Sequence, residues 1–242
     1  MSGFTDGRHD GATIEEWVFA AWSPDASLGL VSGHRIVGRT AWYWAALARD
    51  GHPLLHVFDG DVTVRSDPFI VKGEVLWAEH SRDAPMEQWS IGNETYAVAL
   101  DEPADALGRA YGERTAIAFD IEWGATGPPS PCPGDPVREV SVLGGVPPGI
   151  DGYVQEGVMH GSIEVLGLPT IRLPGLPARR WHRWTGMTGE TGAGVQMGPL
   201  DLPEAVAHGG VRAPFAFPDG TIADLVLATD GWRSRSVRLR DP

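Results

Sequence analysis

The sequence predicts an all-β protein with few, short helices, and three observations support this prediction. Asp-Gly dipeptides recur along the chain, and several separate β-rich runs, where they supply the positive φ angles of tight hairpin turns. Several short segments rich in β-branched and aromatic residues are bounded by turn residues, as strands are. The segments rich in alanine and leucine are short and lie between Gly and Pro residues, so helices do not organise the fold.

Composition and charge limit the classes of function. The chain has 242 residues, of which 42% are hydrophobic, and it carries a formal net charge of -13. This negative field repels phosphate backbones and anionic membrane surfaces, so we expect no nucleic-acid partner. The N-terminus lacks a basic stretch followed by an apolar one, and no apolar run approaches the roughly 18 residues that span a bilayer. We therefore expect a cytoplasmic protein without a membrane span.

The first elements are a strand and a meander. Thr13 and Glu16 have the spacing of a helix capping box, but the aromatic run that follows them favours a strand. Residues 40–65 predict three consecutive strands, with turns at the Asp-Gly pairs of residues 50–51 and 59–60.

The later elements are two hairpins and two short helices. Residues 87–100 predict a hairpin that turns at its Gly-Asn pair, and residues 220–240 predict another that turns at its Asp-Gly pair. Short helices are expected within residues 102–112 and 202–210, where alanine and leucine cluster between breakers.

Proline and glycine recur too densely in residues 124–152 for regular structure to persist. We therefore predict an N-terminal β-barrel-like domain over residues 1–124, a Pro/Gly-rich connection over residues 125–152 and a C-terminal β domain over residues 153–242.

Several common catalytic and metal-binding signatures are missing from the sequence. Neither G-x-S-x-G nor H-E-x-x-H occurs, and Lys72 is the only lysine, which argues against Schiff-base chemistry. His52 and His56 share one face of a predicted strand, but a proline separates them and no third ligand is evident nearby. The glycine-rich residues 186–194 lack the Lys-Ser/Thr ending of a phosphate loop, and the single cysteine, Cys132, lies in a proline-rich segment. We expect neither a metal nor a cofactor.

Ten tryptophans favour either a large aromatic core or an apolar cavity, since an indole has a large apolar surface and one N–H donor. Trp42 and Trp44 point to the same side of a predicted strand, and Trp181 and Trp184 flank a histidine. β-Barrels of this size often enclose a ligand. We therefore predict a pocket for a hydrophobic small molecule, with aromatic walls formed by Trp42, Trp44, Trp123 and Trp184.

Carboxylates and histidines supply the candidate catalytic groups. Asp120 and Glu122 alternate in the segment FDIEW and face the same way along a predicted strand; burial of either would raise its pKa into the range of a general acid. A solvated strand edge is the alternative. Glu156 and His160 also share a strand face and are expected to line the cavity, although surface exposure is an alternative for them too.

Four segments carry a resemblance to a known family: EEWVFAAWSPDASLGL, MEQWSIGNETYAVALDE, IAFDIEWGA and GYVQEGVMHGSIEVLGLPTIRLPGLPARRWHRWTG. In this order, over about residues 14–186, they resemble the carotenoid 1,2-hydratase (hydroxyneurosporene synthase) and AttH-like superfamily, including its uncharacterised bacterial relatives. The resemblance implies two lipocalin-like antiparallel β-barrels, or one barrel with a partial barrel or sandwich. It also implies isoprenoid or polyketide substrates and no cofactor, because the family includes hydratases and Diels-Alder-type cyclases.

The segment PARRWHRWTG carries the most telling part of this resemblance. The family typically reads Arg-Asp-His-x-Trp-Gly here, and Arg180, His182 and Trp184 match, whereas a tryptophan and a threonine replace the aspartate and the glycine. The resemblance places His182 and Trp184 in the active site. No tyrosine follows Tyr153, so the downstream tyrosine of the hydratases has no counterpart. On a strand Arg180, His182 and Trp184 share one face, which we predict to look into the cavity.

Three hypotheses for the function follow. The first is a cofactor-free hydratase, cyclase or isomerase, in which His182 and a carboxylate, Asp120 or Glu122, act on an apolar molecule in an aromatic pocket. A Diels-Alder-type enzyme would need only shape, a few hydrogen bonds and exclusion of water. The second is a lipocalin-like carrier that uses the same pocket without chemistry. The third is a structural β domain whose tryptophans are only core.

Overall fold

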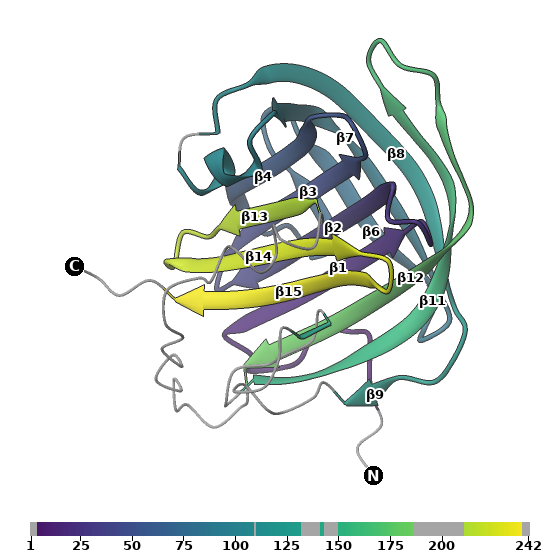
Figure 1. The fold of residues 1–242 in the computed structure, drawn as a ribbon. Helices are drawn as coiled ribbons and strands as arrows, with labels where there is room; N and C mark the ends of the chain where they lie inside the picture. The colour runs from purple at the N-terminus through teal and green to yellow at the C-terminus, as the bar shows by residue number, and fades with distance from the viewer. Residues whose placement is uncertain (1–3, 109, 132–140, 143–149, 186–210, 239–242) are drawn as a thin grey trace.

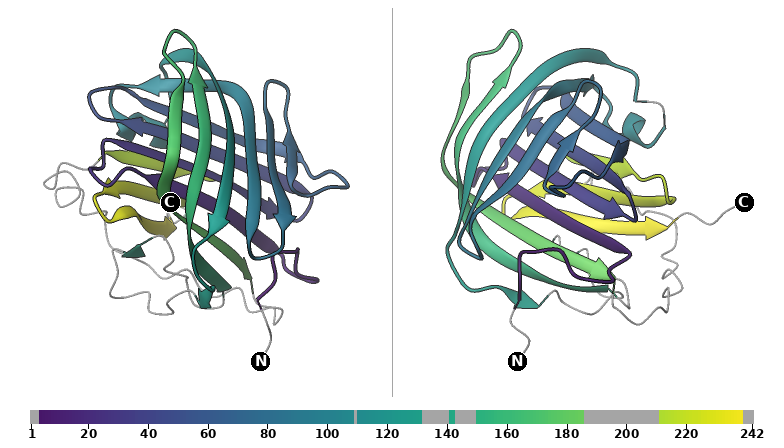
Figure 2. Two further views of the ribbon diagram at one scale, coloured as in Figure 1. Left: turned by 90° about the vertical axis from the view of Figure 1, so that its right-hand side faces the viewer. Right: turned by 180° about the vertical axis from the view of Figure 1, so that it is seen from behind.

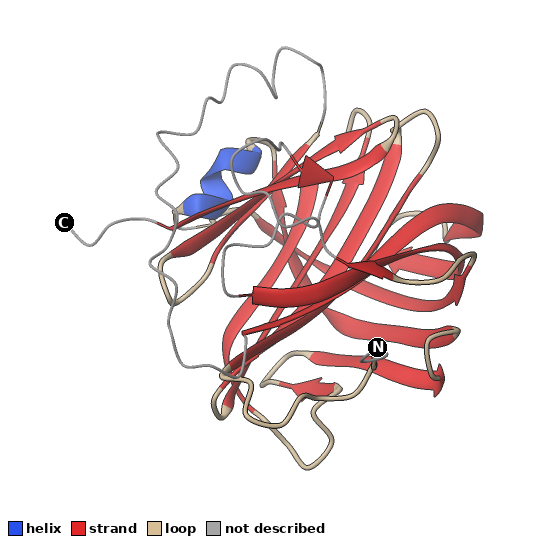
Figure 3. Cartoon of the chain, turned by 90° about the horizontal axis from the view of Figure 1, so that it is seen from below, coloured by secondary structure: helices blue, strands red, loops and turns tan. Residues whose placement is uncertain are grey.

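The structure is a computed structural model, and it describes residues 4–108, 110–131, 141–142, 150–185 and 211–238. Within these ranges nearly all regular structure is β, with one short 3-10 helix, η1 (Pro103–Leu107), so the all-β prediction is confirmed (Figures 1 and 3). No helix in the same ranges has the length and apolar character needed to cross a membrane. The strands are β1 (Ile14–Trp22), β2 (Leu28–Val37), β3 (Thr40–Arg49), β4 (Leu54–Thr63), β5 (Ile70–Lys72), β6 (Trp77–Ala84), β7 (Gln88–Leu100), β8 (Glu113–Ala125), β9 (Ser130–Pro131), β10 (Ser141–Val142), β11 (Ile150–Val165), β12 (Ile171–Thr185), β13 (Arg212–Ala216), β14 (Thr221–Ala228) and β15 (Gly231–Arg238).

Eight of these strands form a closed antiparallel barrel. They follow one another in the order β4-β3-β2-β1-β12-β11-β8-β7, and β7 also pairs with β4, which closes the ring. The closing ladder, which we call the seam, joins only residues 54–56 of β4 to residues 98–100 of β7. The first half of β7 pairs instead with β6. β6 pairs in turn with β5, so these two strands form a hairpin at the end of the sheet (Figures 1 and 2).

A smaller four-stranded sheet, in the order β10-β15-β14-β13, packs on the outside of β1, β2 and β3 (Figure 1). Its side chains Phe215, Leu225 and Trp232 share a hydrophobic core with Trp44 of β3. The indole Nε1 of Trp232 donates a hydrogen bond to the carbonyl oxygen of Ala21 at 3.0 Å. The described strands therefore form one barrel with an additional sheet packed against it as a partial sandwich.

The position of β1 between these two cores explains why its sequence is almost continuously apolar. Trp17 and Phe19 belong to the core inside the barrel, whereas Val18 and Ala20 belong to the core beneath the small sheet. Because both faces of the strand are buried, neither needs polar residues, and the usual alternation of polar and apolar residues is lost.

Two predicted turns lie inside strands, and packing explains both corrections. β4 runs through Asp59 and Gly60, where a Cβ added to Gly60 would lie 2.9 Å from the Phe58 ring, so glycine leaves space for that ring. β7 likewise runs through the predicted Gly-Asn turn, where a Cβ added to Gly92 would lie 2.9 Å from the Trp77 ring. These glycines allow close packing and do not reverse the chain.

The reversal predicted at Gly92 occurs instead at residues 85–87, where Met86 has a positive φ of 62°. The predicted N-terminal strand, the turn between β3 and β4 and the C-terminal hairpin of β14 and β15 are confirmed. The helix expected after β7 is the 3-10 helix η1. The helix expected within residues 202–210 and Cys132 lie outside the described residues.

The predicted connection at residues 125–152 is not a boundary between the two sheets. β11 and β12 follow it in the sequence, but they pair with β8 and β1 and complete the barrel. The boundary between the barrel and the small sheet instead follows β12. Much of the connection, and the glycine-rich residues 186–194, lie outside the described residues.

Candidate active site

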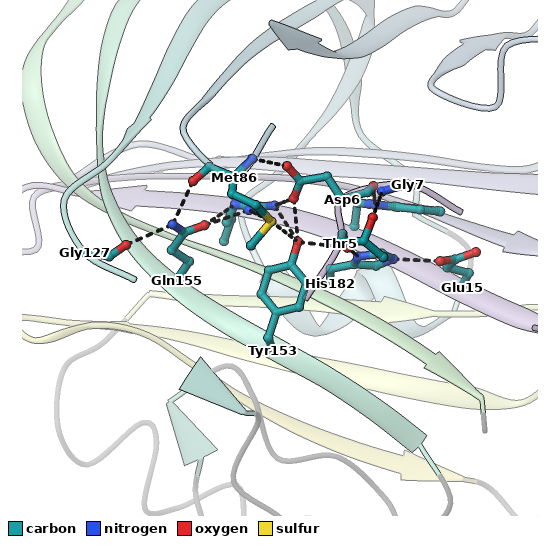
Figure 4. Close-up of polar contacts among 11 residues, drawn as sticks. Thr5, Asp6, Gly7, Glu15, Met86, Gly127, Tyr153, Gln155 and His182 are labelled. Carbon is teal, nitrogen blue, oxygen red and sulfur yellow. Dashed lines mark hydrogen bonds and ion pairs between the residues drawn. The ribbon is translucent and has the colours of Figure 1, made fainter. Parts of the chain in front are cut away.

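The segment that precedes β1 lies against the inner side chains at one end of the barrel (Figure 4). The carbonyl oxygen of Thr5 is 3.1 Å from His182 Nδ1, and the carbonyl oxygen of Asp6 accepts a hydrogen bond from Trp17 Nε1 at 3.1 Å. Main-chain carbonyls of this segment therefore hold side chains of β12 and β1 in place.

Arg180 of β12 is the centre of the buried polar contacts. Its Nε and Nη2 donate to Gln155 Oε1 at 3.0 and 2.7 Å, and its Nη1 donates to the Tyr153 hydroxyl oxygen at 3.1 Å. The Met86 sulfur lies 3.7 Å from Nη2. The Trp123 ring lies over the guanidinium at 4.9 Å. The positive charge is thus held by directional hydrogen bonds and an aromatic face rather than by water.

The carboxylate of Asp6 completes this group. Its Oδ1 lies 2.7 Å from Arg180 Nη1 and accepts the Tyr153 hydroxyl hydrogen at 2.5 Å, while its Oδ2 accepts the Met86 backbone N–H. Burial raises the pKa of the Tyr153 hydroxyl above its usual range, so this group stays protonated as a donor. With all its partners in place, this carboxylate acts as an anchor for the N-terminal segment.

His182 and Glu15 share one proton. His182 Nδ1 faces the Thr5 carbonyl, which only accepts hydrogen bonds, so this nitrogen carries a hydrogen. A neutral ring would then have no hydrogen on Nε2, but Nε2 lies 2.8 Å from Glu15 Oε1, and neither side chain is more than 1% exposed. The contact requires a proton, either as imidazolium with carboxylate or as neutral imidazole with carboxylic acid. One transferable proton therefore lies between these two atoms, away from water.

Burial lowers the pKa of His182, and the hydrogen bond and negative charge of Glu15 oppose this shift. A ring in this environment releases its proton more readily than a histidine in water. The pair therefore has the chemistry of a general acid next to a carboxylate that can accept its proton.

His9 lies on the more exposed side of Glu15. Its Nδ1 is 2.8 Å from Glu15 Oε1, its side chain is 22% exposed, and its ring stacks on Trp184 with 3.7 Å between centroids. It therefore connects the buried pair with solvent. Among the described residues, one group could hold a metal ion. It consists of His9, Glu15 and His182, whose ligand atoms lie within 4.8 Å of one another.

Aromatic rings surround His182. The Trp17 indole stacks on His182 with 4.6 Å between centroids, and on its other side it stacks on His34 at 4.9 Å. Trp184 lies 5.0 Å from the His182 ring, and Tyr153 meets it edge-on at 5.5 Å. Such faces stabilise a positive charge on a neighbouring group.

Some residues predicted for the site meet in this region. Arg180 and His182 share the inner face of β12, as the alternation predicts, and Trp181 lies on the opposite face in the core beneath the small sheet. Trp184 contacts His9, and Trp123 is buried in the barrel core over Arg180.

The predicted carboxylates lie elsewhere. Asp120 and Glu122 are exposed on the outer face of β8, because Phe119 and Ile121 occupy the inward positions of that strand. They therefore do not belong to the interior, which corrects their predicted place beside His182.

Glu156 and His160 are likewise exposed, on the outer face of β11, where Glu156 forms an ion pair with Arg179 at 2.7 Å. Their inward neighbours on this strand include Gln155 and Met159, which are buried. The expectation that Glu156 and His160 line the cavity is therefore corrected as well.

Trp42 and Trp44 share a face of β3, as predicted, but this face looks outward. Their rings pack against Phe217 and Phe215 of the small sheet, with centroids 5.8 and 4.8 Å apart. These two indoles join the barrel to the second sheet and do not line the barrel interior.

The sequence did not predict Asp6, His9, Glu15 or Tyr153 as site residues. For Glu15 a signal exists, since it alternates with Trp17 and Phe19 on a strand whose inward positions are otherwise apolar. Asp6 has no such signal, because it lies in a segment without periodicity and its partners are on distant strands.

Two grooves lie away from this site. The larger, about 780 Å³, is at the other end of β11, where Tyr96, Leu166 and Leu168 are exposed. The smaller, about 320 Å³, lies beside His56 at the seam. His182 lines neither of them.

Comparisons with known proteins found few similarities. No protein-family model matches the chain, and no curated protein matches its sequence. Among solved structures, the chain is similar to CghA at 11% identity and a TM-score of 0.34, covering 89% of this chain and 53% of CghA. The chain thus spans about half the length of CghA. A likeness at this level determines neither fold nor activity.

Proposed function

We propose that the protein is a cofactor-independent enzyme, a hydratase, cyclase or other isomerase, that protonates an apolar isoprenoid- or polyketide-like small molecule. The observation that carries this proposal is the buried contact of 2.8 Å between His182 Nε2 and Glu15 Oε1, which requires one proton between them. Protonation of an alkene needs an acid in a dry site and electron-rich faces that stabilise the resulting cation. Trp17 and Trp184 supply such faces beside His182.

The proposed step balances without a cofactor. The proton moves from His182 Nε2 to one alkene carbon, the π electrons form the new C–H bond, and a cation remains on the adjacent carbon. In a hydratase, water adds to this cation and loses a proton; in a cyclase, a second alkene attacks it and a proton is lost from carbon. The released proton returns to the His182–Glu15 pair, to which His9 connects from the exposed side.

A lipocalin-like carrier is the second candidate. The groove of about 780 Å³ at the far end of β11 favours it, because this groove is open and includes the exposed side chains Tyr96 and Leu166. A carrier needs apolar surface and an opening but no transferable proton.

The test begins with native mass spectrometry, which identifies an apolar molecule that co-purifies with the protein. This molecule, or a panel of acyclic isoprenoid and polyketide polyenes, is then incubated with the protein in D2O. We expect a product with one deuterium bound to carbon. His182→Asn and Glu15→Gln are each expected to lower the rate by about 100-fold or more, as loss of a general acid does. His160→Asn, on the exposed face of β11, is the matched control and is expected to retain the rate.

The outcomes separate the hypotheses. An unchanged rate in His182→Asn would refute proton transfer from this residue, and a cyclised product without deuterium on carbon would indicate a pericyclic reaction. Ligand recovered unchanged would favour the carrier. We expect activity to survive removal of metals by EDTA, whereas loss and recovery on adding Zn²⁺ would assign His9, Glu15 and His182 to a metal site instead.

A further inference from the structure

A second chain of buried polar groups crosses the barrel interior next to Trp17. It starts at the Asn93 amide and passes through the Tyr43 hydroxyl, the Ser32 hydroxyl and the His80 ring to the His34 ring. The four successive distances are 2.9, 3.0, 2.9 and 2.7 Å. None of the five side chains is more than 1% exposed, so their hydrogen-bonding needs must be met from inside the barrel.

The direction of each hydrogen bond follows from the first. With the Asn93 amide assigned so that Nδ2 faces Tyr43, Nδ2 donates to the Tyr43 hydroxyl oxygen, and Tyr43 sends its own hydrogen to its other neighbour, Ser32 Oγ. Ser32 has then accepted one hydrogen bond, and it donates its hydroxyl hydrogen to His80 Nε2. His80 Nε2 is therefore an acceptor and carries no hydrogen.

The two rings at the end of the chain are neutral. Burial lowers the pKa of His34 to about 3 and the pKa of His80 well below its usual value. A neutral His80 without a hydrogen on Nε2 carries it on Nδ1, which donates to His34 Nδ1 at 2.7 Å. His34 then carries its own hydrogen on Nε2. Among the described residues, this nitrogen has no hydrogen-bond partner.

The opposite direction of the chain satisfies fewer groups. It requires Ser32 to donate to Tyr43, and the Tyr43 hydroxyl hydrogen then has no acceptor, because its other neighbour is the amide nitrogen of Asn93. The His34 nitrogen stays without a partner in this direction too. One more buried group is therefore left unsatisfied, which disfavours the reversed chain.

We propose that the Nε2–H of His34 anchors an oxygen acceptor, such as a carbonyl oxygen, on an apolar small molecule bound inside the barrel. The surroundings fit such a ligand: Trp17 stacks on the His34 ring at an interplanar angle of 11°, and Phe69 meets it edge-on with 6.0 Å between centroids. Aromatic side chains around one polar donor are typical of the lining of sites for small apolar molecules.

The anchor deepens the proposed function, because it adds an oxygen acceptor to the expected substrate. The location of the anchor inside the barrel rests on that proposed function. His34 and His182 lie on opposite faces of the Trp17 indole, so the oxygen acceptor and the alkene that receives the proton belong to separate parts of one molecule. Ser32, Tyr43 and His80 are positioning residues, because they determine which nitrogen of His34 carries the hydrogen.

NMR tests the hydrogen positions directly. In protein labelled with ¹⁵N at histidine, long-range ¹H–¹⁵N spectra distinguish a ring protonated on Nδ1 from one protonated on Nε2. At pH 7 we expect His80 to carry its hydrogen on Nδ1, the less common form in free histidine, and His34 to carry its hydrogen on Nε2. Ser32→Ala removes the donor to His80 and is expected to move the His80 hydrogen to Nε2, whereas Ser90→Ala, outside the barrel beside Asp83, leaves both rings unchanged.

Binding of two matched probes tests the anchor. Carvone and limonene share a carbon skeleton, but only carvone has a carbonyl oxygen. We expect carvone to bind at least about fivefold more tightly than limonene and to shift the His34 Nε2 resonance. In Ser32→Ala the two affinities are expected to become equal, and in Ser90→Ala the difference is expected to persist.

A hydrogen on His34 Nδ1, equal affinities in the wild-type protein or failure of carvone to bind would each overturn the anchor. Neither measurement depends on turnover. An inactive or unaffected His182→Asn variant would therefore bear on the proposed enzymatic step alone.

Discussion

The carboxylate of Asp6 and the guanidinium of Arg180 form an ion pair of 2.7 Å in which neither side chain is more than 1% exposed. The pair fastens the segment before β1 to the inner face of β12. Tyr153 and the Met86 backbone supply further hydrogen bonds to the carboxylate. Because both charges have lost their hydration, each stabilises the fold only while the other is present.

Asp6→Asn is expected to lower the free energy of unfolding by about 3–5 kcal/mol, since it leaves the Arg180 charge buried without a partner. Urea unfolding measures this loss. Asp10→Asn changes an exposed residue of the same segment and is the control. Its free energy of unfolding is expected to stay within about 0.5 kcal/mol of the wild-type value. A loss under about 1 kcal/mol in Asp6→Asn would contradict the anchoring role of the pair.

Gly157→Ala is expected to destabilise the barrel by about 1–3 kcal/mol through overpacking. A Cβ at this position would lie 2.5 Å from Trp123 Nε1 and 2.6 Å from the Gly124 carbonyl oxygen. Thermal and urea unfolding measure the effect. Gly124→Ala on the neighbouring strand is the matched control, because a Cβ there meets no atom within 4 Å. Equal stability of the two variants would show that Trp123 is free to move away from β11.

Buried histidines are expected to make the fold sensitive to mild acid. Burial lowers the pKa of His34 to about 3, that of His56 to about 4 and that of His80 well below 6.5. In the unfolded chain each ring binds a proton below about pH 6.5, so the unfolded state binds more protons and stability falls as pH falls. Between about pH 6.5 and 4, each ring is expected to contribute a loss approaching about 1.4 kcal/mol per pH unit.

Urea unfolding between pH 7.5 and 5 measures this slope. His56→Phe removes one titrating ring but keeps an aromatic partner for Phe215, so the slope is expected to fall by up to about 1.4 kcal/mol per pH unit. Glu16 titrates below this range, because burial raises its pKa but Arg183 and Arg35 lower it to about 2. The same slope in His56→Phe and the wild-type protein would mean that His56 is not neutral in the fold.

The double variant Asp120→Asn, Glu122→Gln is expected to retain the catalytic rate within about twofold, and its stability within about 0.5 kcal/mol, because both side chains lie on the outer face of β8. The assay is the deuterium-incorporation measurement proposed for His182→Asn. A large loss of rate in the double variant would show that Asp120 or Glu122 takes part in catalysis.

Alternation along a strand explains which parts of the site the sequence predicts. It correctly places Arg180 and His182 together on one face of β12, with Trp181 on the other. Alternation does not say which face is the inner one. For Trp42 and Trp44 both faces of β3 are buried, so nothing in the local pattern distinguishes the barrel interior from the interface with the small sheet.

Contacts between distant segments explain what the sequence does not predict. Asp6 lies in an irregular segment, and its role depends on Arg180 and Tyr153, which β11 and β12 bring to the same end of the barrel. In the sequence Glu15 has the pattern of a solvent-exposed residue at the start of a strand. Only the structure shows that His182 and His9 pack around it. The all-β class follows from local propensity, whereas these pairings follow from the closure of the barrel.

The seam is the part of the barrel that we expect to open most readily. Three residue pairs close the ring between β4 and β7, whereas nine join β1 to β2. Local opening is cheapest where the fewest hydrogen bonds must break, so amide hydrogens at the seam are expected to exchange with solvent deuterium sooner than those of β1. Such an opening, beside His56, would admit an apolar molecule from the side, without displacing the segment that Asp6 holds across the end of the barrel.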